Sequence, residues 1–171
     1  MSLIKVNNRS LGTGTVTHGV LPAGTVLSVN SARKVDTFSM SATSFADVPG
    51  LSVTVTPKSA SSKFLVSASI CCGNDWWHAN NYFGIYEGGT TVGGDGTQPW
   101  IYQFGANDAN AASEGDQFYD EVLRSPNTTS PITYKVVIAS TNGSYAATVN
   151  RMNSASTKRG ASFITVREIQ G

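Results

Sequence analysis

Apolar and polar residues alternate with a period of two in short runs along most of the chain, and this pattern limits the fold more than any other feature. The clearest run places Ile132, Tyr134, Val136 and Ile138 on one face. Successive side chains of a β-strand point to opposite faces, so such a run predicts a strand with one buried side. Residues 106–114 are the best helix candidate, but they contain two asparagines. The sequence therefore predicts an all-β fold.

Turn signals separate the predicted strands. Further strands are expected at residues 36–43, 51–56, 63–72, 82–86, 99–104, 117–123, 145–149 and 162–169. Val48-Pro49-Gly50 is typical of a type II turn, because proline presets φ and glycine accepts a positive φ, and it predicts a hairpin between the first two strands. Asn142-Gly143 predicts a second hairpin, and Gly88-Gly89 a third turn. About eight to ten short strands favour a jelly-roll-like antiparallel β-sandwich.

The N-terminal part of the chain differs from the rest. Residues 11–24 are rich in glycine and threonine, and no aromatic residue precedes Phe38. Such a stretch contributes little to a core, so residues 1–33 are predicted to form an extended arm for docking or oligomerisation. A strand-like piece at residues 25–29 is expected to join this arm to the domain. Residues 34–171 are predicted to form the β-sandwich domain, which is long enough to bury a core without cross-links.

Charged residues are sparse and scattered. They make up 13% of the chain, with 12 Lys and Arg against 11 Asp and Glu. Because no basic stripe could neutralise a run of phosphates, nucleic acid is not expected as a partner. The longest apolar run, residues 64–70, is too short to cross a bilayer, so no membrane is expected either. The N-terminus lacks the apolar segment of a signal peptide, so synthesis in a cytoplasm is expected.

The chemistry-bearing residues form no recognisable catalytic motif. His18 and His78 are isolated, which does not fit a zinc site, and no Gly-x-Ser-x-Gly sequence occurs. Cys71 and Cys72 are neighbours, so on a strand they point apart and are expected to stay reduced, one buried and one not. The sequence predicts no enzyme, no catalytic residue, no cofactor and no metal. A small carbohydrate-active enzyme is the weaker alternative, and it would need two carboxylates facing each other across a cleft.

One quarter of the chain holds all three tryptophans. The candidate ligand-binding residues there are Trp76, Trp77, His78, Asn80, Tyr82, Trp100 and Tyr102. Aromatic rings beside amides suit sugars, because the ring stacks on the C–H face while polar groups fix the hydroxyls. The structural alternative is that Trp76 or Trp77 caps the core or fills an oligomer contact. Both cannot enter the same core, since neighbouring strand residues point apart.

Six segments carry a further signal. They are residues 24–29, 34–39, 44–57, 61–66, 132–136 and 162–169. Together they resemble the jelly-roll domains of tail-fibre and virion surface proteins of tailed bacteriophages, of the type found in phages of marine bacteria and cyanobacteria. The resemblance covers about residues 24–171, and its most specific part is the first predicted hairpin. Residues 74–124 do not share it.

The resemblance implies a jelly roll, often in a homotrimer, that attaches to the particle or touches the host surface. A tail fibre is usually much longer, so this chain fits a capsid decoration, a head fibre or a short tail-fibre component. We therefore expect a structural protein of a tailed phage virion, made in the host cytoplasm and docked through its arm onto capsid or tail proteins. Leu65, Trp76, Trp77 and Phe163 lie off the predicted core faces and could fill subunit contacts. The alternative is a host-receptor module that binds a cell-surface glycan around Trp76, Tyr82 and Trp100.

Overall fold

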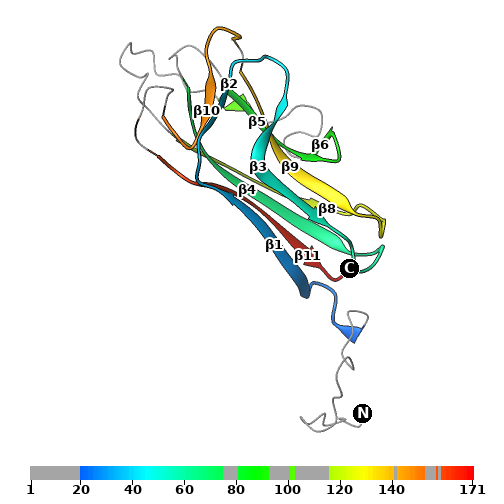
Figure 1. The fold of residues 1–171 in the computed structure, drawn as a ribbon. Coiled ribbons are helices and arrows are strands. Elements are labelled where there is room, and N and C mark those ends of the chain that lie inside the picture. The colour runs from blue at the N-terminus through cyan, green and yellow to red at the C-terminus, as the bar shows by residue number, and fades with distance from the viewer. Residues whose placement is uncertain are drawn as a thin grey trace, which may run out of the picture.

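The computed structural model describes residues 20–74, 81–92, 101–102, 116–140, 142–152, 157 and 159–171. In this part of the chain the strands form two antiparallel sheets that pack face to face, with no α-helix (Figure 1). Sheet A contains β1 (Val26–Lys34), β11 (Ser162–Ile169), β4 (Lys63–Asn74), β8 (Asp116–Arg124), β10 (Ala147–Val149) and β2 (Phe38–Met40). Sheet B contains β3 (Ala46–Val55), β9 (Ile132–Ser140), β5 (Asn81–Glu87), β6 (Thr90–Thr91) and β7 (Ile101–Tyr102).

The strand order defines the fold. Sheet A runs β1-β11-β4-β8, and the short strands β10 and β2 continue it beyond the end of β11. Sheet B runs β3-β9-β5, with β6 and β7 on the far edge of β5. Chain neighbours therefore sit mostly in opposite sheets, which is the interleaved Greek-key arrangement of a jelly roll. The chain is an all-β, jelly-roll-like antiparallel sandwich, as its sequence predicts.

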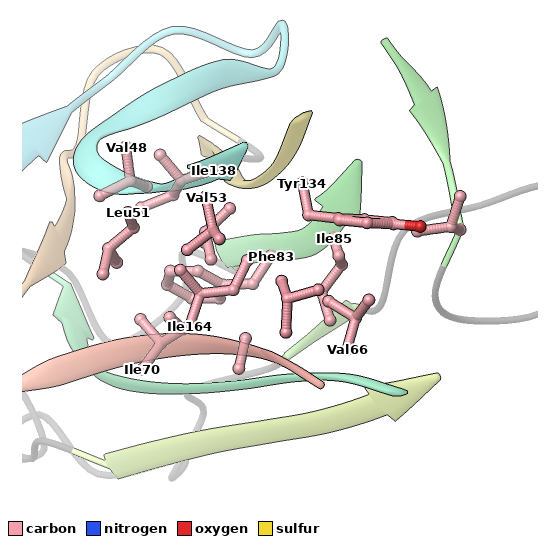
Figure 2. Close-up of a cluster of buried hydrophobic side chains, with 14 of the residues drawn as sticks. Val48, Leu51, Val53, Val66, Ile70, Phe83, Ile85, Tyr134, Ile138 and Ile164 are labelled. Carbon is pink, nitrogen blue, oxygen red and sulfur yellow. The ribbon is translucent and has the colours of Figure 1, made fainter. Parts of the chain in front are cut away.

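The core lies between the two sheets and uses the faces that the alternation predicts. In Figure 2, Val48, Leu51 and Val53 of β3 point toward Ile70 of β4 and Ile164 of β11. The rings of Phe64 and Tyr134 meet across the sandwich at 6.0 Å between centroids, and those of Phe83 and Phe118 stack at 5.8 Å. The apolar faces predicted for residues 51–55, 64–70, 132–138 and 164–166 therefore point inward.

The first predicted hairpin is wrong. Pro49 and Gly50 lie inside β3, where the pairing register with β9 shifts between Asp47 and Ser52. The positive φ of Gly50, 82°, serves this irregularity instead of a turn. Proline has no N–H to donate to a neighbouring strand. It is tolerated here because β3 is an edge strand of sheet B, so one of its sides has no paired strand. The preceding strand β2 pairs with β10 in the other sheet.

The second predicted hairpin is also wrong, although its turn forms. Asn142 Oδ1 accepts the Ser144 N–H at 3.0 Å, and the Asn142 carbonyl accepts the Tyr145 N–H at 3.0 Å. The turn leads from β9 in sheet B to β10 in sheet A, because β3 and β5 already occupy both edges of β9. The turn at Gly88-Gly89 does form a hairpin, between β5 and β6, and both glycines have positive φ.

The first strand begins inside the segment that the sequence assigns to an arm. β1 pairs antiparallel with β11 from Val26 to Lys34. Residues 26–33 are therefore part of the sandwich, while residues 1–19 of the predicted arm lie outside the described residues. Cys71 and Cys72 are not joined by a disulfide and point apart, with Cys72 in the core and Cys71 half-buried. Burial raises the pKa of the Cys71 thiol, which keeps it protonated at neutral pH.

Candidate functional site

The structure places two of the seven predicted ligand-binding residues. Tyr82 lies on β5 and is half-buried, and the backbone of Tyr102 pairs with Asn81 from β7. The remaining predicted residues, Trp76, Trp77, His78, Asn80 and Trp100, lie outside the described residues, as does the side chain of Tyr102. The structure describes the strands β4, β5 and β7, which flank this tryptophan-rich part of the chain.

The two strand ends that flank residues 75–80 are held together tightly. The buried Asn81 side chain at the start of β5 donates a hydrogen bond to the Gly73 carbonyl near the end of β4, at 2.8 Å. Gly73 is itself packed against the backbone of Arg151 and Met152. A strand end closed in this way fixes the base of the segment between β4 and β5, because neither strand can shift without breaking a buried contact.

This packing predicts a specific sensitivity at Gly73. A Cβ added there would overlap the Met152 carbonyl and lie 2.7 Å from the Arg151 carbonyl oxygen, so the backbone has to move. We expect Gly73→Ala to lower the free energy of unfolding by about 2 kcal/mol. Gly143→Ala is the matched control, since its Cβ would meet Ser41 at an ordinary 3.5 Å. Chemical denaturation measures both variants, and equal stabilities would contradict the packing argument.

An aromatic cluster lies on the outer face of sheet B beside this base. Phe45, which precedes β3, contacts Tyr82 and Tyr86 of β5, with ring centroids 6.2 and 6.1 Å away. Tyr86 lies across from Lys135, whose ammonium pairs with Asp47 at 2.7 Å. The cluster therefore combines ring faces with a neighbouring ion pair, which is the chemistry that suits a sugar.

Sequence reasoning found only one member of this cluster. Tyr82 and Tyr86 could have been grouped, because strand residues four apart point to the same face. Phe45 carries no such signal, since it reaches β5 from a distant part of the chain. The segment before β3 is brought there by a backbone hydrogen bond from the Ser140 N–H to the Ala42 carbonyl, at 2.9 Å.

A second surface is exposed on the opposite side of the molecule. The outer face of sheet A carries Val29 of β1, Phe163 of β11, Leu65 of β4, and Tyr119 and Leu123 of β8. Four of these belong to the seven large hydrophobic side chains that are exposed among the described residues, and Leu65 is half-buried. We call this set the sheet A apolar face. It includes Leu65 and Phe163, the two described residues that the sequence assigns to subunit contacts.

Two features are absent from the described part of the chain. No group of three or more His, Cys, Asp or Glu side chains lies close enough to hold a metal ion among these residues. Nor does any helix within them have the length and apolar character needed to cross a membrane.

Comparisons with known proteins add a likeness of fold. The sequence matches no protein-family model and no curated protein. The crystal structure of the infectious bursal disease virus VP2 subviral particle is similar to this chain, with a TM-score of 0.42 and 11% identity. The structure of the infectious bursal disease virus Gx strain is similar with a TM-score of 0.36 and 12% identity. Each match covers 83% of this chain but only 38% and 36% of the viral chains. Likenesses this weak do not assign the chain to a family.

Proposed function

We propose that this chain is a non-enzymatic structural subunit of a virus particle, specifically an outward-facing capsid decoration, head fibre or short tail-fibre component of a tailed phage. The observation that carries the proposal is the sheet A apolar face. Exposed apolar side chains on the outer side of a sandwich are costly in an isolated monomer, and they are typical of surfaces that other proteins cover. The jelly-roll strand order and the resemblance of residues 24–171 to phage surface domains support the same role.

In this role the chain contacts other virion proteins, and its N-terminal residues are the proposed docking segment. The test is the location of the chain during infection. A tagged chain expressed in infected cells should band with intact particles in a density gradient and stay with them after a salt wash. A deletion of residues 1–19, which leaves β1 and its pairing with β11 complete, should release it. A chain that remains in the soluble fraction of the lysate would contradict the proposal.

A second candidate function is recognition of a cell-surface glycan. The aromatic cluster of Phe45, Tyr82 and Tyr86 favours it, because this cluster sits beside the clamped base of the tryptophan-rich segment. In this hypothesis the cluster extends the predicted site at Trp76, Trp77 and Trp100.

We expect Trp77→Ala to abolish binding of a soluble oligosaccharide from the host surface while leaving the melting temperature unchanged. Stacking of an aromatic ring on a sugar supplies contact area that alanine cannot replace. Tyr119→Ala is the matched control, because Tyr119 is an exposed aromatic residue on the other sheet. Calorimetry with a monovalent ligand measures both variants. Binding that survives Trp77→Ala, or that is lost equally in the control, would refute the glycan site.

A further inference from the structure

The sheet A apolar face has a regular grid of side chains that can be read from the strand pairing. In one row across the sheet, Arg33, Phe163, Ser69 and Tyr119 are neighbours from β1 to β8. In the next row of the same face, Ser31, Thr165, Ser67 and Glu121 are neighbours. In the third, Val29, Arg167, Leu65 and Leu123 are neighbours. The edge strands β1 and β8 therefore carry most of the large or charged side chains of this face. The middle of β4 carries the small residues Ser67 and Ser69.

Charge is distributed unevenly over this grid. The two arginines lie on β1 and β11, at one side of the face, while Glu121 lies on β8 at the other side. Within one chain, Glu121 accepts the Tyr119 hydroxyl at 3.0 Å and forms a 3.9 Å ion pair with Arg167, which donates a hydrogen bond to the Ser67 hydroxyl at 3.2 Å. Arg33 is exposed on the outer edge of the sheet, on the opposite side from Glu121.

We propose that the sheet A apolar face binds a second copy of this chain, face to face, about a two-fold axis parallel to the strands. This operation lays β1 of one copy over β8 of the other, and β11 over β4. It brings Arg33 of each copy to Tyr119 and Glu121 of the other, where the guanidinium meets an aromatic ring and a carboxylate. The proposal rests on the assembly role proposed above and names the partner of that face.

The same axis also brings apolar side chains into the contact. Phe163, which is 38% exposed, falls over the position of Ser69 in the other copy, a short side chain that lies buried beneath Gln117. Val29 falls over Leu123, which removes an exposed aliphatic side chain of each edge strand from water. Two-fold contacts use the same patch twice, so a face that complements itself fits a dimer better than the three-fold ring that the phage resemblance implies.

The area of the face is sufficient for a stable contact. Four strands about 4.8 Å apart and about nine residues long, at about 3.3 Å per residue, cover a face of roughly 19 by 30 Å. Two copies would bury roughly 1,100 Å², which exceeds the approximate 1,000 Å² expected of a biological interface. The two sheets would then pack in the aligned manner that is common for sandwiches.

A charge exchange between copies tests the pairing. In Arg33→Glu the paired positions 33 and 121 are both acidic, and in Glu121→Arg the same two positions are both basic. Because like charges then face each other twice, each variant alone should bind itself about 100-fold more weakly than the unaltered chain. An equimolar mixture of the two variants restores opposite charges at both contacts, so it should form a mixed dimer. Sedimentation velocity measures all three samples with the full-length chain.

An apolar pair of variants provides the matched control. Val29 is 61% exposed on the face, and Val35 is 57% exposed just beyond the end of β1. Val29→Glu should dissociate the dimer, whereas Val35→Glu should not, and both should keep the melting temperature of the unaltered chain.

Three results would overturn the pairing: an unaltered chain that sediments as a monomer, one that sediments as a trimer, or a mixture of charge variants that stays monomeric. These outcomes are separable from the proposed virion role. A monomer that still bands with particles would refute the dimer and keep the role, and a dimer that stays in the lysate would do the reverse.

Discussion

Asn150→Ala should lower the free energy of unfolding by about 4 kcal/mol. The Asn150 side chain is buried and donates hydrogen bonds to the Lys34 and Asp36 carbonyls, both at 2.9 Å. Its Oδ1 accepts the Ser162 hydroxyl at 2.6 Å. Each of these bonds is worth about 1 kcal/mol, and alanine also pays about 1 kcal/mol for the left-handed backbone at φ 61°.

Two further substitutions separate these contributions. Asn150→Gly keeps the backbone conformation and loses only the side-chain bonds, so it should cost about 3 kcal/mol. Asn127 has nearly the same backbone, at φ 52°, but its side chain is exposed. Asn127→Ala should therefore cost only about 1 kcal/mol. Denaturant unfolding measures all three, and equal losses at positions 150 and 127 would show that the buried hydrogen bonds contribute nothing.

The large effect at Asn150 follows from its position between four segments. Besides its side-chain bonds to the end of β1 and the start of β11, its N–H donates to the Cys71 carbonyl of β4 at 2.8 Å. Its carbonyl accepts the Gly160 N–H at 3.1 Å. One residue thus ties β1, β4 and β11 together at the end of sheet A where the segment between β1 and β2 meets the chain that follows β10.

Sequence alternation predicted the strands and their buried faces because both depend on neighbouring residues alone. Ile132, Tyr134, Val136 and Ile138 face the core because a strand has no other way to place them. Strand pairing is different, since it is decided by which edges are free. The turn at Asn142-Gly143 formed as its residues predict, but β9 had no free edge, so the chain crossed to the other sheet.

In the candidate sites too, features set by neighbouring residues could be predicted, whereas features set by distant contacts could not. The outward-facing positions of Leu65 and Phe163 follow from alternation, and both lie on the sheet A apolar face. Phe45 and Asn150 act through contacts with residues distant in the chain, and no local pattern marks them. Glu168 is intermediate. It follows Ile164 and Val166 on the core-facing side of β11, so alternation places its carboxylate at a core position. The residues that donate hydrogen bonds to this carboxylate are distant in the chain, so alternation does not predict them.

Glu168→Ala should cost about 3 to 4 kcal/mol, because this carboxylate joins three segments at the other end of sheet A. It is 2% exposed, and its Oε1 accepts the Lys58 N–H at 2.6 Å and the Ser62 hydroxyl at 2.8 Å. Its Oε2 accepts the Ser28 hydroxyl of β1 at 3.2 Å. Hydrogen bonds to a charged group are the stronger kind, and alanine would leave donors without a partner.

Glu168→Gln keeps the shape and one acceptor oxygen, so it should lose about 1 kcal/mol. Asp47→Ala is the control for a carboxylate in an exposed ion pair and should lose less than about 1 kcal/mol. Because Ser28 precedes Val29 on β1, release of Glu168 should also loosen the edge strand that carries part of the proposed dimer face. Glu168→Ala should therefore weaken self-association as well as folding, whereas Asp47→Ala should affect neither. If Glu168→Ala were as stable as Asp47→Ala, the carboxylate would not be holding β1 against β11.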